Sequence, residues 1–409
     1  MFAPPDEKTV LRSDRPPAFV TYGWCRTSYT VVWSLAQKGI DVHVGDSSPL
    51  AMSRFSKYAN SFTSLPDFFV EPDRYFERVC QALKKTGAKV LLPCHEDIGI
   101  FSRRRSALPA GVMSPLPEFR LYDKIEDKLG CIELGRAHGC PVPETAPVVS
   151  FEELDRFREF RGWPLVLKTR AGNGAKGVRV VRDFEELSGE FRGLIEIFGL
   201  ARDRWPIIQE YLPGRVMGVG VVYHRGRCIA AGADRYLRFK DRGLTGTATL
   251  REIPKDSNLV DVAVSFLDKL GWHGLAQVEF IPDKNGIPRL NEVNARPWGS
   301  MALQVHAGAD FPYIWYRSAL DDAPASGRAG PIRSIKCRWL VGDAIAFAQL
   351  VKEKRVGAAL RVLRPYRHCR HDDFLIQDPL PLVFEGLDYF TKMIERGGSF
   401  NPAAKGQIR

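Results

Sequence analysis

Two glutamates that face each other across a hairpin are the feature that most constrains how this 409-residue chain folds. In GLAQVEFIPDKNGIPRLNEVNARPWGS, residues 274–300, two strand-like runs flank Asn285-Gly286, the favoured pair for a two-residue type I′ turn. That turn sets Lys284 opposite Ile287, and the same register sets Glu279 directly opposite Glu292. Opposed carboxylates repel each other in a sheet, so this pairing predicts a cation between them.

Strand alternation adds an amide and a guanidinium to the face that carries Glu292. Asn294 and Arg296 follow it by two and four residues. Two carboxylates and an amide oxygen are hard ligands that suit Mg²⁺, which completes its shell with water and nucleotide phosphates. Arg296 would neutralise charge on a phosphoryl group in transfer. The pattern indicates a Mg²⁺-nucleotide site, and a solvated acidic hairpin balanced by Arg289 is the alternative.

A glycine pattern at Gly172-Asn-Gly-Ala-Lys-Gly177 matches the dinucleotide fingerprint in letters only. That fingerprint needs a helix after its glycines, whereas PLVLKTR before and VRVVR after both resemble strands. The glycines Gly172, Gly174 and Gly177 therefore cap a hairpin that folds over phosphates, with Lys168 and Lys176 as cations beside it. The alternative is a surface hairpin that binds no ligand. A protein kinase lacks support because no His-Arg-Asp or Asp-Phe-Gly follows, and a Walker loop would need Gly-Lys-Ser/Thr.

A short apolar strand, Ile207-Ile-Gln-Glu-Tyr-Leu-Pro-Gly214, lies between these two motifs in the sequence. Alone it is typical of an ordinary strand. Beside a phosphate-covering hairpin and a magnesium site, its exposed backbone amide and carbonyl groups are a suitable edge for an adenine ring.

The remaining sequence divides into an α/β start and a looser end. Alternating strand and helix patterns, such as AFVTY (18–22) and KVLLPC (89–94), predict a small parallel-sheet domain over the first 118 residues. A helical pattern runs from Asp123 to His138, and another near 151–161. The last segment begins with DDAPASGRAGP and is expected to be an appended extension.

As a set, these motifs resemble the ATP-grasp superfamily over roughly residues 1–320. The resemblance rests on Asp127-Lys-Leu, VLKTRAGNGAKGVRVV, IIQEYLPG, and AQVEF paired to LNEVNARPWGS. It implies an α/β (α+β) architecture with a pre-ATP-grasp domain (1–118), a two-lobed ATP-grasp module (119–320) and a C-terminal extension (321–409). It also implies ATP and Mg²⁺ as cofactors.

The resemblance also implies roles for individual residues. Lys128 and Lys168 would contact ATP phosphates, and Arg296 would steady the transferred phosphate. The adenine edge would be Glu210, Tyr211 and Leu212, and the Mg²⁺ ligands Glu279, Glu292 and Asn294. Many members carry a ribose-binding Glu in a Gly-x-Glu pattern after the adenine strand, whereas this chain reads Gly214-Arg-Val, so Glu210 would serve alone.

A basic stretch, RYLRFKDRGLTGTATLR (235–251), suits a loop that covers an anionic substrate, although an ordinary solvated loop is equally compatible. Arg251 lies where the family often binds an acceptor carboxylate. The resemblance favours a carboxylate-amine ligase that works through an acylphosphate. A small-molecule kinase and a nucleotide-binding regulator without turnover are the alternatives.

Charge and composition limit the kinds of binding partner and the cellular location that we expect for this chain. The formal charge is +11, which is a weak pointer to anionic partners. The first residues do not resemble a signal peptide, and no apolar run is long enough for a membrane span. Eight cysteines without a Cys-x-x-Cys pair suggest reduced thiols and a cytoplasmic location. The expected partners are small-molecule carboxylate and amine substrates, not nucleic acid, and a homodimer is compatible with the sequence.

Overall fold

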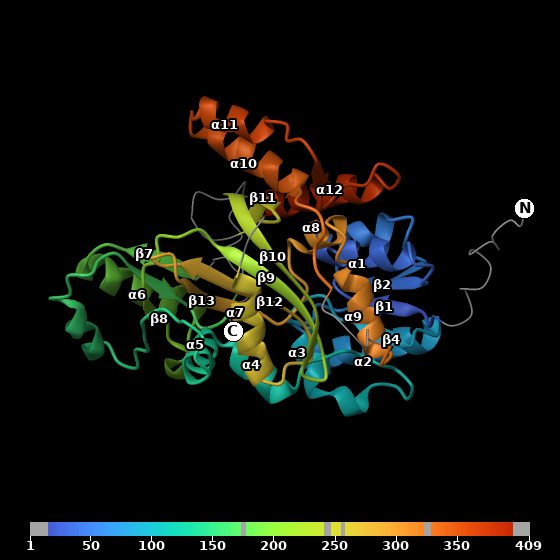
Figure 1. Ribbon diagram of the computed structural model, residues 1–409, viewed down its shortest axis with the longest axis horizontal. Coiled ribbons are helices and arrows are strands. Elements are labelled where there is room, and N and C mark those ends of the chain that lie inside the picture. The colour runs from blue at the N-terminus through green and yellow to red at the C-terminus, as the bar shows by residue number, and fades with distance from the viewer. Residues whose placement is uncertain (1–14, 173–176, 241–246, 255–257, 323–328, 396–409) are drawn as a thin grey trace, which may run out of the picture.

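The computed structural model describes residues 15–172, 177–240, 247–254, 258–322 and 329–395. Its strands form three sheets of four, seven and four strands, with helices packed around them (Figure 1). This mixed α/β architecture, with a parallel sheet at its N-terminal end, confirms the predicted fold class. No helix within the described ranges is long and apolar enough to cross a membrane.

The N-terminal sheet is entirely parallel. Its spatial order is β3 (Ser61–Ser64), β2 (Val42–Asp46), β1 (Ala18–Val20) and β4 (Val90–Leu92). The helices of this region are α1 (Arg26–Ala36), α2 (Pro72–Thr86) and α3 (Ile98–Arg103). The strands β1 and β4 are buried along their whole length, as parallel strands covered on both faces should be.

The expected single helix from Asp123 to His138 is wrong, because the chain forms two helices there. These are α4 (Phe119–Glu126) and α5 (Lys128–Ala137), and Asp127 between them has an extended backbone. Its side chain accepts a hydrogen bond from the Leu129 backbone N–H, so it caps α5. The break leaves Lys128 as the first residue of a helix instead of one in its middle.

The small antiparallel sheet carries the glycine hairpin. Its order is β5 (Thr145–Ala146), β8 (Ile207–Glu210), β6 (Leu165–Lys168) and β7 (Val178–Val181), and α6 (Phe184–Phe198) packs on it. The strands β6 and β7 pair antiparallel on either side of the glycines, which confirms a hairpin there and excludes the dinucleotide fingerprint. The helix expected near 151–161 is a short 3₁₀ helix over Glu152–Phe157.

The seven-stranded sheet holds the paired glutamates. Its order is β13 (Pro288–Asn294), β12 (Gly274–Pro282), β9 (Met217–His224), β10 (Arg227–Phe239), β11 (Ala248–Glu252), β14 (Lys336–Arg338) and β15 (Cys369–His371). The helices α7 (Leu259–Lys269), α8 (Met301–His306) and α9 (Phe311–Ala319) accompany it, and α9 also packs against α1 and β4 of the N-terminal region.

The hairpin turn differs from the expected one, yet the glutamates still pair. Asp283, not Lys284, pairs with Ile287 through its backbone N–H, which makes a three-residue loop. The Asp283 carboxylate accepts the backbone N–H groups of Asn285 and Ile287 and so stabilises the longer loop. A bulge at Asn291 then restores the register, so Glu279 lies opposite Glu292 as predicted.

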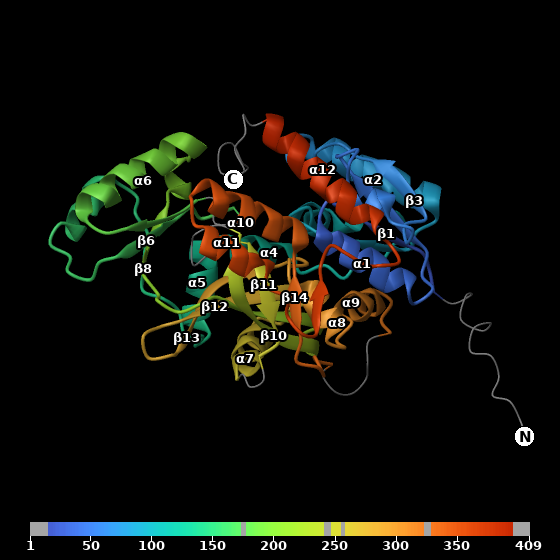
Figure 2. The same cartoon turned by 90° about the horizontal axis from the view of Figure 1, so that it is seen from above.

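The C-terminal residues extend this sheet and also contact the N-terminal region. The strand β14 pairs with β11, and β15 pairs with β14. Three helices complete the segment: α10 (Leu340–Lys352), α11 (Val356–Leu363) and α12 (Leu380–Glu395). Figure 2 shows α12 lying over the N-terminal region, where Asp388 accepts hydrogen bonds from Trp24 and Ser48. The proposed domain boundaries at 118 and 320 stay predictions.

Packing under the glutamate hairpin gives a test of the fold. A methyl group added at Gly220 on β9 would lie 2.0 Å from the buried ring of Trp298. We therefore expect Gly220→Ala to lower the free energy of unfolding by about 1–3 kcal/mol through overpacking. Gly189→Ala, within α6 where nothing lies within 4 Å, is the control and should stabilise by about 0.5–1 kcal/mol. Equal melting temperatures for the two variants would contradict this packing.

Candidate active site

The opposed glutamates lie in a partly buried polar cluster. The Tyr236 hydroxyl donates a 2.9 Å hydrogen bond to Glu279 Oε1, and Gln277 Nε2 donates a 2.9 Å bond to that hydroxyl. Burial, together with the charge of Glu292 across the strand pair, raises the pKa of Glu279 to about 8. At neutral pH the Glu279 carboxyl is therefore largely protonated beside Glu292.

Arg296 and Asn294 join this cluster, as the strand alternation predicted. Arg296 Nη2 donates to Asn294 Oδ1 at 2.9 Å, and Asn294 Nδ2 lies 3.5 Å from Glu292 Oε1. Burial opposes the charge on the guanidinium, but Glu96, Glu126 and Glu292 outweigh it, so the pKa of Arg296 is raised. This arginine therefore stays charged beside the carboxylate pair.

Two lysines lie near the glutamate pair: Lys168 at the end of β6 in the small antiparallel sheet, and Lys128 at the start of α5. Lys128 Nζ donates to Gly172 O at 2.8 Å and lies 3.5 Å from Glu292 Oε2. Lys168 Nζ donates to Asn291 Oδ1 at 2.7 Å, and burial lowers its pKa to about 8. The bulge that restores the hairpin register thus also supplies the partner of Lys168.

Asp127 fixes the approach of Lys128, and sequence reasoning did not give it a role. Its carboxylate accepts from Arg170 Nε at 3.0 Å and forms a 3.3 Å ion pair with Arg204. The Lys128 backbone N–H donates to Arg170 O, directly before the glycine segment. The position of Asp127 as a helix cap, one residue before a candidate ligand, was the available signal.

A cavity of about 380 Å³ opens beside these groups, between the N-terminal region and the hairpin. Its lining combines the aromatic residues Phe68, Phe69, Phe119 and Tyr122 with the charged residues Glu96, Arg103, Arg104, Asp123, Glu126, Asp127, Lys128, Arg204, Glu292 and Arg296. Glu126 Oε1 accepts from the Ala295 backbone N–H at 3.2 Å, and burial followed by the charge of Glu96 raises its pKa to about 7. Sequence reasoning missed Glu96 and Glu126, since nothing in their spacing sets them apart from surface acids.

The expected adenine edge lies at the end of β8. Glu210, Tyr211 and Leu212 are all half-buried there. The Glu210 carboxylate accepts the Glu144 backbone N–H at 3.0 Å, so part of its hydrogen-bonding capacity is already used. Among the glycine-hairpin residues, Gly172 lines the cavity and Gly177 lies against Thr169, with no room for a side chain. Gly174 and Lys176 fall outside the described residues.

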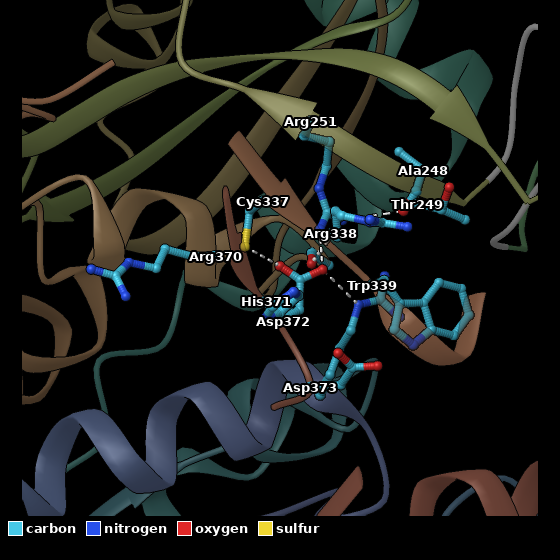
Figure 3. A network of polar contacts seen from close by, with 12 residues as sticks. Ala248, Thr249, Arg251, Cys337, Arg338, Trp339, Arg370, His371, Asp372 and Asp373 are labelled. Carbon is cyan, nitrogen blue, oxygen red and sulfur yellow. Dashed lines mark hydrogen bonds and ion pairs between the residues drawn. The ribbon is translucent and has the colours of Figure 1, made fainter. Parts of the chain in front are cut away.

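Arg251 lies apart from this cluster, in a buried ion pair. Its guanidinium contacts the Asp372 carboxylate and donates to Gly299 O at 3.1 Å, while Cys337 Sγ donates to the same carboxylate at 3.0 Å (Figure 3). Burial opposes its charge, but Asp372 outweighs this and raises the pKa of Arg251. Arg251 does not line the described cavity. Its contacts are those of a structural link between β11 and the segment after β15.

The donor set fits a magnesium-nucleotide complex better than a metal bound by protein alone. Within the part of the chain that the structure describes, no three His, Cys, Asp or Glu side chains are grouped to hold a metal. Two carboxylates and one amide group do lie together, at Glu279, Glu292 and Asn294, where the amide oxygen accepts from Arg296 and the amide nitrogen lies toward Glu292. Such an incomplete shell of hard oxygens suits Mg²⁺, which takes its remaining ligands from water and phosphate.

Comparisons with known proteins agree with this geometry. The family described as "ATP-grasp in the biosynthetic pathway with Ter operon" matches residues 203–341. Rat mitochondrial pyruvate carboxylase is 25% identical over 217 residues, covering 49% of this chain and 18% of that protein. The small subunit of Hydrogenobacter thermophilus 2-oxoglutarate carboxylase is 24% identical over 237 residues, covering 54% and 48%. The chain thus spans less than half the length of these curated relatives.

Solved structures agree along most of the chain. The biotin carboxylase domain of the H. thermophilus enzyme, a dimer with MgADP and bicarbonate, has a TM-score of 0.63 at 18% identity, covering 77% of this chain and 72% of that one. An L-amino acid ligase from Bacillus licheniformis gives 0.61 at 16%, covering 79% and 80%. N5-carboxyaminoimidazole synthetase from Staphylococcus aureus, complexed with ADP, gives 0.63 at 16%, covering 83% and 86%. This chain has the ATP-grasp fold, which confirms the predicted resemblance to that superfamily.

The raised pKa of Glu279 predicts a pH dependence. A carboxyl whose pKa is about 8 in the folded chain and near 4.5 when unfolded favours folding below pH 4.5, and this contribution is lost as the pH rises to 8. Without Mg²⁺, the melting temperature should therefore fall between pH 5 and 8. Glu292→Gln should make this fall shallower and stabilise at pH 8 by a few tenths of a kcal/mol or more, because it removes the like charge. Thermal melts in EDTA with the same slope for both proteins would contradict the carboxylate pairing.

The position of Arg251 gives a second prediction. Arg251→Met leaves the buried Asp372 with the more distant Arg26, at 3.5 Å, as its remaining cation among the described residues, so we expect a loss of about 3–5 kcal/mol in the free energy of unfolding. Arg235→Met on the neighbouring strand breaks a half-exposed pair with Glu252 and should cost about 1 kcal/mol or less. Denaturant unfolding measures both. An unchanged denaturation midpoint for Arg251→Met would contradict this structural role and favour the predicted role of Arg251 as a substrate ligand.

Proposed function

We propose that this chain is an ATP-dependent carboxylate-amine ligase. The observation that carries the proposal is the meeting of Glu279, Glu292, Asn294 and Arg296 with two lysines beside one cavity. In this account ATP phosphorylates a substrate carboxylate, an amine attacks the acylphosphate, and ADP and phosphate leave. The ligase and synthetase of the same fold support this class of reaction.

The position of each side chain in the site suggests its role in this reaction. Lys128 and Lys168 would hold the phosphates, since both ammonium groups lie close to the glutamate hairpin. Glu279, Glu292 and Asn294 would hold Mg²⁺, which would shield the charge on the phosphates. Arg296 would stabilise the phosphoryl group as negative charge develops during its transfer. Glu210, Tyr211 and Leu212 would receive the adenine at the end of β8.

The cavity would hold the acceptors. Its aromatic residues would help to keep water from an acylphosphate and so protect it from hydrolysis. Its mixed charges suit substrates that carry both a carboxylate and an amine. Arg251 would act in this account as a positioning residue, because its bond to Gly299 O holds the chain three residues after Arg296.

Location and assembly also remain proposals. All eight cysteines are free thiols, which supports the expected reducing environment of the cytoplasm. A homodimer is compatible with the dimer formed by the H. thermophilus biotin carboxylase domain.

The ligase proposal predicts a double substrate requirement. Inorganic phosphate should be released from ATP only when a carboxylate and an amine are both present, and a screen of amino acids and other carboxylates would identify the pair. With ¹⁸O-labelled carboxylate, one label should appear in the phosphate. Glu292→Gln should lower this turnover about 100-fold or more, because Mg²⁺ loses a charged ligand, whereas the Gly189→Ala control should not change it.

A different outcome would separate the alternatives. A stable phosphorylated product formed without any amine would identify a kinase and refute ligation, while leaving the nucleotide site in place. ATP binding without turnover, after a broad screen, would favour a regulator.

A further inference from the structure

The segment from the end of α10 through β15 concentrates the positive charge of the chain. Between residues 351 and 371 lie seven basic residues against the single acid Glu353, a formal charge of +6 out of the +11 of the whole chain. They are Lys352, Lys354, Arg355, Arg361, Arg364, Arg367 and Arg370, and all are exposed. Among the described residues, Arg355 alone of the seven has an ion pair, with Glu353 at 4.0 Å. The charge is therefore free to act on an external partner.

An apolar stripe lies among these cations. On α11, Val356, Leu360 and Leu363 follow helical spacing of four and three residues and are 59%, 60% and 56% exposed. Ala359 and Val362 on another face of the same helix are buried. Figure 1 places α11 at the outer edge of the molecule, beyond α10. The stripe thus faces away from the protein's own core.

Hydrogen bonds to the rest of the protein fix the orientation of α11. Arg338 Nη2 donates to the Val362 carbonyl at 2.8 Å, and Arg338 and Arg238 both bind the buried Asp343 carboxylate of α10. These bonds hold the end of α11 against the rest of the protein. Turning the apolar stripe inward would break them, so its exposure is built into the fold.

The charge decides between candidate partners. A second copy bound through the same face would bring two +6 segments together, which opposes a symmetric dimer there. Nucleic acid is disfavoured because the exposed apolar side chains of α11 are aliphatic and offer no ring for base stacking. An anionic bilayer surface matches both features, since aliphatic side chains enter the boundary of the acyl chains while cations contact lipid phosphates.

We propose that α11 and the basic residues around it (351–370) form a docking surface for anionic phospholipid membranes. This surface is separate from the candidate active site and does not depend on the proposed ligase reaction. Binding is peripheral: the apolar stripe enters the interface, and the arginines and lysines remain at the headgroups.

The test uses the full chain and vesicles of phosphatidylglycerol and phosphatidylcholine in equal amounts, measured by cosedimentation. Binding should be strong at 0.1 M NaCl, at least tenfold weaker at 0.5 M NaCl, and absent with phosphatidylcholine alone. Arg361→Gln/Arg364→Gln should weaken binding at least tenfold, at roughly fivefold per cation. Leu360→Ser/Leu363→Ser should weaken it by a similar factor.

A matched control comes from α12, which also exposes apolar residues but lacks the cluster of cations. Val383 and Leu387 there are 53% and 44% exposed. Val383→Ser/Leu387→Ser should leave vesicle binding unchanged, and thermal melts establish that each variant is folded. The proposal is overturned if the wild-type protein does not bind anionic vesicles, or if the α11 and α12 variants bind these vesicles equally well. It is also overturned if the protein binds DNA of equal phosphate concentration but not the vesicles. The proposal is also overturned, in favour of a second copy as the partner, if the α11 variants change the sedimentation coefficient of the protein but bind vesicles as the wild-type protein does.

Discussion

The repulsion between Glu279 and Glu292 organises the rest of the site. A sheet that sets two carboxylates opposite each other loses stability unless something compensates. Here the Tyr236 hydroxyl donates to Glu279 and accepts from Gln277, while Lys128 lies close to Glu292. Burial first, and then the charge of Glu292, still raise the pKa of Glu279 to about 8 despite these contacts. The remaining demand for positive charge is what a magnesium-nucleotide complex would meet.

The sequence was sufficient for the fold and for the central pair, because both depend on local patterns. Two strand-like runs around Asn285-Gly286 predicted the hairpin, and strands on both sides of the glycines excluded a dinucleotide site. The exact turn was not predictable, since the Asp283 carboxylate stabilises a longer loop and the bulge at Asn291 compensates for it. The predicted pairing of Glu279 with Glu292 is therefore confirmed, although the two-residue turn from which it was predicted is wrong.

Features that depend on distant parts of the chain could not be predicted. Arg251 resembled a substrate ligand in sequence, but its partner Asp372 lies more than a hundred residues away. Glu96 and Glu126 come from different elements and meet only at the cavity. The C-terminal segment looked appended, yet β14 and β15 complete the large sheet and α12 reaches the N-terminal region. Each of these requires tertiary pairing that no local spacing encodes.

The most direct measurement is calorimetric titration of the metal-free protein with ATP, in the presence and absence of Mg²⁺, alongside NADH. We predict that ATP binds, that Mg²⁺ tightens this binding in the wild-type protein, and that Glu279→Gln/Glu292→Gln abolishes the Mg²⁺ effect while keeping the fold. Binding of NADH without binding of ATP, or an equal Mg²⁺ effect in the double variant, would contradict the claim that the opposed glutamates hold a magnesium-nucleotide complex.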